Sequence, residues 1–577
     1  MSSRGFTWLT LAIVTTIVAW TCWPVVEVPQ LEPDDFRYLS LIEQLQAGLG
    51  AGLPESFVVE NRWDHLWYVE TDAVLRFFRP TVLTSFWLDK VLWKDPITGL
   101  CWSNVILFLT SAVLVVFVLK RMLKDRLAVL FGSALYAALF AHGECIWYVS
   151  GRTETLAAIG FLAGLALWIQ GPDRRRLRQL AIVAYAFALF TKELTAALPV
   201  VCLLWDRWIE RREGSLYALL KRDAKLWIAW GSVAVGYFVL RQVVLGRTSA
   251  GQLIEPYFVS PLSANFPGHL WMQLRSYVGN LVAAEVTPPF MKPEDLAAWS
   301  TLTGWILGSL AMLGAGFLVV REPLARLLAA LAVLTWLPTC FVYVSERYLL
   351  LPSLAVAGLA ALGLAKLRTQ PIARWAGIAV LLLWTGHQAS LLRLKHVLIC
   401  QSPRVANATM QHLQTALPHP PAKGATILFI AYPGDDIAAQ FLEPHMRCFF
   451  HDPTLRVHVL SVLPQRERLP QPVTVKRLGP SSLELRGTPS VMAHGNLFKY
   501  VDYASRTPIT SPRLGFTATV LDGDATACRA VRFDFERPLR ECLVLRFHRW
   551  PADFDKDLEH APKGIQISRC SLEVLRP

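Results

Sequence analysis

The sequence predicts a polytopic α-helical membrane protein of about eleven transmembrane helices, with a soluble α+β or mostly β domain at its C-terminal end. Over 577 residues, 53% are hydrophobic and the mean hydropathy is +0.37, which lies outside ordinary soluble composition. Only 18% are charged, and these cluster between long apolar runs. After about residue 400 the hydropathy falls and proline becomes frequent, as in LPHPPAKG at 417–424.

Nine apolar segments are long enough to cross about 30 Å of hydrocarbon. They are 6–26, 98–119, 127–149, 153–170, 226–245, 301–320, 327–344, 349–366 and 373–391. The stretch 178–206 fits either one long helix or a hairpin of two short spans that turns near Lys192 and Glu193. The basic loops on either side of it decide between these alternatives.

Clusters of Lys and Arg in short loops are typical of the cytoplasmic side of a membrane protein. Three such clusters lie at 120–126, 174–178 and 207–225. A single helix over 178–206 would place the second and third clusters on opposite sides, so we predict the hairpin and about eleven spans. The N-terminus is then cytoplasmic and the C-terminal domain periplasmic, as in a multi-pass protein of the bacterial inner membrane.

This topology divides the chain into a transmembrane domain at 1–398 and a periplasmic domain at 399–577. The outer loops 27–97 and 246–300 belong to the first domain. The second begins with a β-like run, followed by a helical stretch near 437–449 and by the alternating runs RVHVLSVL, VTVKRL, SLELRG and RAVRFDF. Its cysteines would lie in an oxidising compartment, where pairing is open but partners do not follow from sequence: Cys448, Cys528, Cys542 and Cys570.

The net charge of +13 does not predict a nucleic-acid partner. Much of the excess basic charge lies in the short loops, where membrane topology already requires it. The partner expected from this composition is the lipid bilayer.

Two adjacent carboxylates, Asp34 and Asp35, follow the first apolar segment. Such a pair at a membrane surface suits a general base that takes a proton from an acceptor hydroxyl, or a divalent cation site. Capping of a helix N-terminus by either residue is an equally good explanation.

Further ionisable residues fall in three other outer turns. The stretch HGECIWYVSGRTET places four of them together: His142, Glu144, Arg152 and Glu154. Lys192 and Glu193 lie at the tip of the hairpin, and Glu346 and Arg347 precede the tenth span. Ionisable residues at this depth are functional candidates, although an Arg and Glu network that joins helix ends is the simpler alternative.

Three of these residues are cations from three different turns, namely Arg152, Lys192 and Arg347. Together they could bind a phosphate or diphosphate group. The remaining residues are candidates for supporting roles or for metal ligands: His142, Glu144, Glu154, Glu193 and Glu346.

In order along the chain, these stretches resemble the GT-C superfamily of membrane glycosyltransferases, and within it the membrane portion of the transmembrane TPR-containing O-mannosyltransferases and their bacterial relatives. FRPTVLTSFWLDKVLWKDP at 78–96 is similar to the family's RP segment, and Asn104 stands where the family has an Asn. His142-x-Glu144 followed by SGR-x-Glu154, TKELTAALP at 191–199 and SERYLLLPS at 345–353 resemble its later motifs.

The match covers about residues 20–370 and departs from the family in two respects. Cys101 and Phe108 replace the His residues that usually flank Asn104, and the family's TPR tail is absent from this sequence. Neither the role of those imidazoles nor the family's acceptor therefore carries over to this chain.

The resemblance implies a transferase whose donor substrate is a polyprenyl-phosphate sugar. Transfer would occur with inversion on the non-cytoplasmic face, with or without a divalent metal, and the acceptor would be a protein, a lipid or a glycan. Asp34 or Asp35, with Asp35 favoured, would be the base, and the cations would stabilise the departing lipid phosphate.

Two rival functions stay open at this stage. The missing His residues suit a catalytically degenerate relative that serves as a scaffold subunit of a membrane assembly. A secondary transporter would also have many spans, but the chain has no internal repeat and its ionisable residues gather at one surface.

Overall fold

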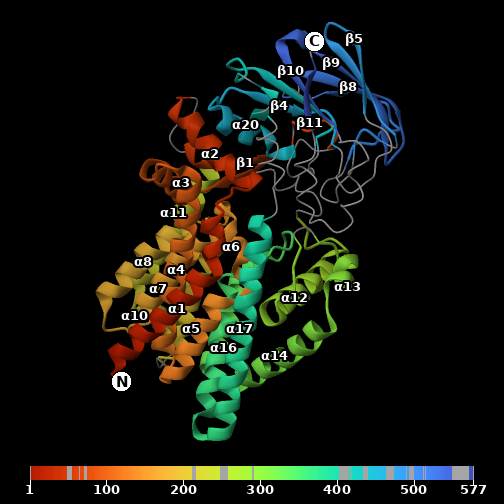
Figure 1. Ribbon diagram of the computed structural model, residues 1–577. Helices are drawn as coiled ribbons and strands as arrows, with labels where there is room; N and C mark the ends of the chain where they lie inside the picture. The colour runs from red at the N-terminus through yellow and green to blue at the C-terminus, as the bar shows by residue number, and fades with distance from the viewer. Residues whose placement is uncertain are drawn as a thin grey trace. The chain divides into compact units, whose positions relative to one another are not determined.

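The computed structural model describes most of the chain. The described residues are 2–48, 55–63, 65–69, 74–210, 216–246, 258–288, 291–401, 413–432 without 415 and 418, 439–462, 473–492 without 489, 500–548 without 511, 512 and 514, and 571–575. The chain folds as two compact units (Figure 1). Unit 1 holds 1–30, 78–246 and 256–400, and the described part of unit 2 comes from 31–77 and 401–577.

Residues 31–77 differ from the expectation, because they fold with unit 2 and not with the helical region. Their apolar side chains are buried in the core of unit 2. Trp67 packs edge-on against Phe533 at 5.3 Å between ring centroids, and its indole N–H donates to the carbonyl of Leu460 at 3.1 Å. The last segment of unit 1 ends at residue 400, and the predicted domain division at residue 398 stays a prediction.

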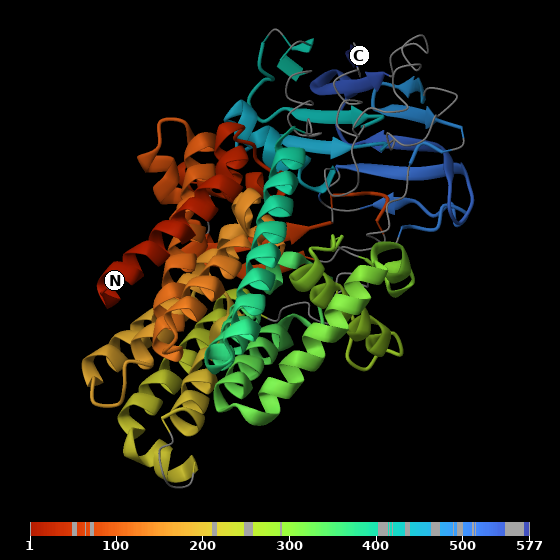
Figure 2. The same ribbon diagram turned by 60° about the horizontal axis from the view of Figure 1, so that its bottom comes forward.

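Each apolar segment predicted to span the membrane is helical in unit 1. The helices that occupy these segments are α1 (Ser3–Glu27), α4 (Pro96–Met122), α5 (Arg126–Ala138), α6 (Gly143–Trp147), α7 (Arg152–Trp168), α8 (Arg175–Leu189), α9 (Leu198–Trp208), α11 (Ala224–Leu245), α14 (Leu302–Arg321), α15 (Pro323–Trp336), α16 (Pro352–Lys366) and α17 (Pro371–Gln401). Both ribbon views show α17, coloured teal, running along the bundle (Figure 2).

Five helices in the described part of the chain are long and apolar enough to cross a membrane on their own, or up to six if the pair α5 and 140–147, bent by 47°, forms one span. The others are too short to cross about 30 Å at 1.5 Å per residue, since α7 has 17 residues and α9 has 11. The count of about eleven spans is therefore not confirmed and stays a prediction.

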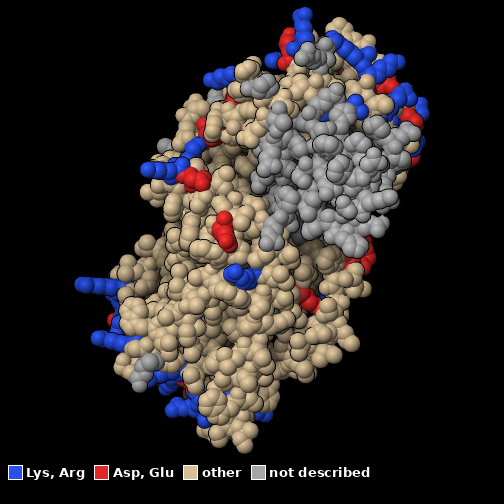
Figure 3. Space-filling view, in the orientation of Figure 1, with Lys and Arg blue, Asp and Glu red and all other residues tan. Residues whose placement is uncertain are grey.

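The surface of unit 1 fits a lipid environment. Helix α14 has a mean hydropathy of 1.8, yet only 11% of its apolar window is buried. It exposes large apolar side chains, including Leu313 (72%) and Val320 (76%). Such a continuous apolar surface is rare on soluble monomers. On the face drawn in Figure 3, unit 1 is almost wholly tan, and Lys and Arg gather toward one end of it.

The predicted hairpin at 178–206 is present as α8 and α9, joined by a turn and the short 3-10 helix η4 (Glu193–Ala197). Helix α7 packs closely against it. A Cβ on Gly160 would lie 2.7 Å from the Cβ of Ala188 and 2.9 Å from its backbone, so only glycine permits this approach.

The predicted outer loop 246–300 contains a helix that the hydropathy pattern missed. Helix α12 (Phe266–Ala283) buries polar as well as apolar residues, among them Gln273, Arg275 and Asn280. Because those buried positions are polar, the segment lacks the uninterrupted apolar run by which we recognised the other helices. The loop also holds η6 (Pro293–Asp295) and α13 (Leu296–Trp299).

Unit 2 is an α+β unit, as predicted for the C-terminal domain. A five-stranded antiparallel sheet has the order β5-β6-β9-β8-β7, a four-stranded mixed sheet the order β11-β10-β3-β4, and β1 (Val58–Arg62) pairs with β2 (Val74–Phe78). The other strands are β3 (Thr426–Ile430), β4 (Arg456–Val459), β5 (Thr474–Gly479), β6 (Ser482–Arg486), β7 (Ile509–Thr510), β8 (Phe516–Gly523), β9 (Cys528–Phe535), β10 (Cys542–His548) and β11 (Ser571–Leu575).

The described part of unit 2 also contains the helices α2 (Pro33–Gln46) and α20 (Leu442–Phe450). Phe36 of α2 stacks on His445 of α20 at 3.7 Å between ring centroids. No disulfide joins any two of the described cysteines Cys448, Cys528 and Cys542, and Cys570 lies outside the described residues.

Candidate functional site

Two turns of unit 1 have the same local design, and each carries a candidate cation. Lys192 and Ser345 have extended backbones, and each is followed by a short 3-10 helix, η4 or η8 (Glu346–Leu349). A proline then begins the next long helix, Pro199 in α9 and Pro352 in α16. Proline suits the first turn of a helix because its fixed φ matches the helix and no partner is needed for the missing N–H.

The first cation, Lys192, is held by two elements outside its own turn. Its ammonium pairs with the carboxylate of Glu154 in α7 and lies 4.7 Å from the ring centroid of Tyr348. The side chain of Lys192 is 13% exposed and that of Glu154 is 6% exposed. The attraction between the ammonium and the aromatic ring helps to hold Lys192 in position, although its side chain is partly exposed.

The second cation, Arg347, is held by a different carboxylate. Its Nε lies 3.7 Å from Glu144 Oε2 and donates to Ser345 Oγ at 3.1 Å. The same carboxylate oxygen accepts hydrogen bonds from the hydroxyl of Ser345 at 2.5 Å and from the backbone N–H of Arg347 at 3.2 Å. A second nitrogen of the guanidinium, Nη2, donates to the Tyr343 hydroxyl at 3.1 Å.

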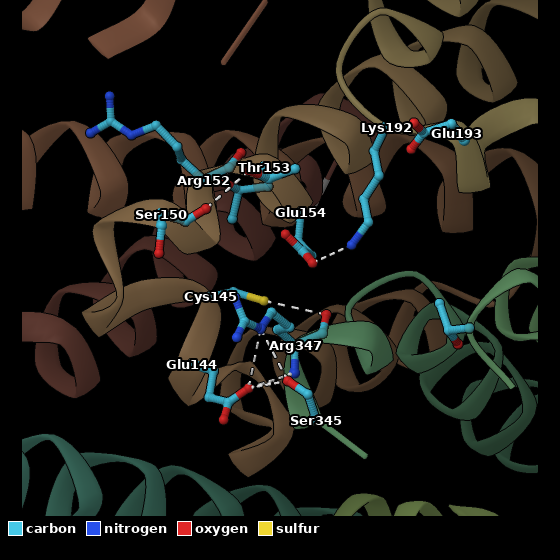
Figure 4. A network of polar contacts seen from close by, with 12 residues as sticks. Glu144, Cys145, Ser150, Arg152, Thr153, Glu154, Lys192, Glu193, Ser345 and Arg347 are labelled. Atoms are coloured by element: carbon cyan, nitrogen blue, oxygen red, sulfur yellow. Dashed lines mark hydrogen bonds and ion pairs between the residues drawn. The ribbon is translucent and has the colours of Figure 1, made fainter. Parts of the chain in front are cut away.

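These five residues lie together, and we call them the turn cluster: Glu144, Glu154, Lys192, Ser345 and Arg347 (Figure 4). The cluster is close enough for its cations to affect each other. Burial lowers the pKa of Lys192, Glu154 opposes this, and the charges of Arg79 and Arg347 lower it further.

Arg152, the third predicted cation, is not part of the turn cluster. Figure 4 shows its side chain pointing away from Lys192 and Arg347. It is fully buried, and its guanidinium pairs with Asp89 of α3 (Pro80–Leu92) at 2.6 Å and donates to Asn104 Oδ1 at 3.1 Å. The ring of Phe86 lies 4.2 Å from its guanidinium carbon. Arg152 therefore connects α7 to α3 and α4. This agrees with the simpler alternative given for these residues, in which ion pairs join helix ends.

His142 is a core residue. It is fully buried, its Nε2 lies 2.7 Å from Ser353 Oγ, and its ring lies between those of Phe108 and Tyr136. Phe108 is one of the residues that replace a family His, and here it packs against the remaining one. In the described residues no three His, Cys, Asp or Glu side chains are grouped as metal ligands would be. The candidate ligands at 142–154 therefore do not form such a group.

The two remaining predicted carboxylates bind cations that sequence reasoning missed. Glu193 pairs with Arg79 at 2.8 Å and with Arg241 at 3.1 Å. Burial alone would raise the pKa of Glu193, but the two guanidinium groups outweigh it and hold the pKa at about 2. Glu346 pairs with Lys395 of α17 and accepts from the side-chain amide of Asn280 at 3.2 Å.

Some signals for the missed residues were present in the sequence. Arg79 and Asp89 both lie in the RP segment at 78–96, and Lys395 lies four residues after the end of the last predicted span. An isolated charge near the end of an apolar segment requires a partner, but the sequence does not say which one.

The proposed base residues belong to unit 2. Asp35 is fully buried in the first turn of α2, and its Oδ2 accepts the backbone N–H of Glu32 at 2.8 Å. Asp34 forms an ion pair with Arg37 at 2.7 Å and its side chain is 18% exposed. Asp35 thus stabilises a helix N-terminus, which is one of the roles that its position predicted.

No family model matches the chain, and no curated protein matches it. Among solved structures, the oligosaccharyltransferase of Archaeoglobus fulgidus in the apo form is 12% identical with a TM-score of 0.48, over 79% of this chain and 64% of that one. The arabinofuranosyltransferase AftD from Mycobacteria is 15% identical with a TM-score of 0.45, over 80% and 32%.

ArnT from Cupriavidus metallidurans bound to undecaprenyl phosphate is 15% identical with a TM-score of 0.43, over 81% of this chain and 87% of that one. The chain thus spans 64% of the length of the archaeal oligosaccharyltransferase that it resembles.

Proposed function

We propose that this protein is a membrane glycosyltransferase that moves a sugar from a polyprenyl-phosphate carrier to an acceptor on the non-cytoplasmic face of the membrane. One observation supports it most: Lys192 and Arg347 come from separate turns, yet both lie in the turn cluster and neither is fully enclosed. Their side chains are 13% and 18% exposed, whereas that of Arg152 is 0% exposed.

The turn cluster suits a leaving phosphate. When the bond between the sugar C1 and the phosphate oxygen breaks, negative charge grows on the phosphate, and fixed cations stabilise it. Lys192 has three N–H donors and Arg347 has five. Glu154 and Glu144 hold these cations in place, so that little reorganisation is needed when phosphate binds.

Asp34 or Asp35 is the proposed base. In a single displacement with inversion, the acceptor oxygen attacks C1, its proton passes to one carboxylate, and the lipid phosphate leaves from the opposite side. The motif position supports both residues, and the exposed fraction favours Asp34 because Asp35 is fully buried.

The experiment measures transfer of radiolabelled sugar from a polyprenyl-phosphate sugar by membranes that contain Asp34→Asn or Asp35→Asn. We expect both variants to fold and at least one to lose transfer. Full activity in both would remove the aspartates from the mechanism. Lys192→Met and Arg347→Met should weaken binding of the lipid phosphate, while Lys124→Met and Arg176→Met, at exposed positions outside the turn cluster, serve as matched controls.

A scaffold without catalytic activity is the second candidate. It is favoured by the ion pairing of the outer turns, where Glu154, Glu193 and Glu346 each already have a cationic partner. A scaffold would tolerate Lys192→Arg and both aspartate variants without any change in the glycans of the cell. A glycan lost on gene deletion and restored by the unaltered chain, but by neither aspartate variant, would exclude it.

A further inference from the structure

Unit 2 contains a small pocket that the proposed transfer reaction does not use. Three of its lining residues are the first residues of neighbouring parallel strands, Cys542 of β10, Thr426 of β3 and Arg456 of β4. They are paired in register, so they form a row across the sheet. His458 lies two residues after Arg456 on the same strand and lines the pocket with it.

The other wall comes from the end of β9. Glu536 and Arg537 directly follow this strand and line the pocket. The backbone N–H of Glu536 donates to the carbonyl of Gly515 at 3.0 Å, which fixes this wall. The pocket therefore lies between segments of both larger sheets of unit 2.

The size of the pocket limits what can enter it. Its cavity volume is about 30 Å³. One water molecule needs about 10–15 Å³ by the same measure. The pocket thus holds a single small group, such as a carboxylate or the outer oxygens of a phosphate, while the rest of the ligand stays outside.

The charges of the pocket favour a group with negative oxygens. Among the described residues Arg456 and Arg537 form no ion pair, whereas Arg447, Arg529 and Arg532 of the same unit do. A guanidinium group presents a planar fork of N–H donors that matches a carboxylate or a phosphate.

His458 gives a second, independent indication of a ligand. Its side chain is 4% exposed, its Nδ1 has no hydrogen-bond partner, and its ring meets Phe516 edge-on at 5.5 Å. Burial lowers the pKa of His458 to about 4, so the ring is neutral near pH 7 and has one donor and one acceptor nitrogen. A buried polar atom without a partner is uncommon in a folded protein.

Glu536 adds a requirement of its own. Glu536 is exposed and also lines the pocket, so its carboxylate repels an anion placed directly beside it but accepts hydrogen bonds from hydroxyl groups. We propose that this pocket binds the oxyanion of a hydroxylated ligand, that is, the carboxylate or phosphate group of an acidic sugar. The proposal does not depend on the transferase function.

Cys542 provides the measurement, because its thiol lines the pocket and is partly exposed. The full-length protein in detergent is alkylated with N-ethylmaleimide in the presence of glucuronate, glucose 6-phosphate or uncharged glucose, and mass spectrometry follows each cysteine. Cys448, which is also partly exposed and outside the lining, is the internal control.

We expect glucuronate, glucose 6-phosphate or both to slow alkylation of Cys542 roughly tenfold at roughly ten times the dissociation constant, with Cys448 unchanged. Protection by one of them alone identifies the carboxylate or the phosphate as the group bound. The proposal would be overturned if glucose protected Cys542 to the same extent, or if neither acidic sugar protected it.

Arg456→Ala and Arg537→Ala should each weaken this protection about tenfold or more, because each removes a charged partner of the oxyanion. Arg540→Ala changes an exposed arginine three residues beyond Arg537 and should leave the protection intact. Faster alkylation of Cys448 would reveal that a variant is unfolded. If Arg456→Ala is unfolded, Arg456→Lys tests the same position with the positive charge retained. Equal protection in all variants would contradict the assignment.

Discussion

Arg152 and Lys192 differ in a way that their sequence positions do not reveal. Both lie in unit 1, in turns predicted to face the outer side, and both pair with a carboxylate from another element. Arg152 is completely enclosed and its donors reach Asp89, Asn104 and the carbonyl of Leu100, whereas Lys192 keeps 13% of its side chain exposed and approaches one carboxylate and one ring.

This difference separates two uses of an ion pair near a membrane surface. A fully buried pair with saturated donors joins helices, since any ligand would first have to displace its partners. A partly exposed pair with unused donors can exchange a carboxylate for a phosphate. The exposed fraction and the donor inventory, more than the charge itself, decide which role a cation can take.

The largest expected effect on folding comes from breaking the Arg152 pair. Arg152→Met leaves the Asp89 carboxylate buried without its cation, which costs about 3–5 kcal/mol in known cases. The variant should therefore unfold at a clearly lower temperature in detergent, with Arg176→Met as the unchanged control. If Arg152→Met unfolds like the unaltered chain, the pair is not the connection between α7 and α3 described above.

The next largest effect separates transfer from stability. Lys192→Met should lower transfer about 10²–10³-fold, equivalent to about 2.7–4 kcal/mol, because one fixed charge opposite the leaving phosphate is lost. Its unfolding temperature should fall less than that of Arg152→Met, since water can reach this pair. Lys192→Arg should recover part of the activity. Transfer at the normal rate in Lys192→Met would remove this residue from the site.

The smallest effect concerns the contrast between a fully buried and a partly exposed side chain in unit 2, where Asp35 is buried and Asp34 is partly exposed. Asp35→Asn weakens the N-terminus of α2 and should cost about 1 kcal/mol, while Asp34→Asn loses only a partly exposed pair three residues apart on a helix, worth about 0.3–0.5 kcal/mol. Urea unfolding of both variants measures the difference. Equal stability of the two would show that the negative charge of Asp35 at the N-terminus of α2 contributes no more to folding than the ion pair of Asp34 with Arg37.

Local structure was largely predictable. The apolar runs, the hairpin near Lys192 and the alternating runs of the C-terminal region correspond to helices, a turn and strands in the structure. Periodicity and hydropathy report on neighbours within a few residues, which is the range over which helices and strands form. Helix α12 was not predicted because polar residues such as Gln273 and Asn280 interrupt the apolar residues of its buried face.

The sequence by itself determined an apolar helical region followed by an α+β region, and the set of ionisable residues in the outer turns. Only the tertiary structure decided which of these residues meet: Arg152 with Asp89, Lys192 with Glu154, Arg347 with Glu144, and 31–77 with unit 2. The physical reason is that such pairs join segments far apart in the chain, where neither periodicity nor propensity acts and only packing selects the partner.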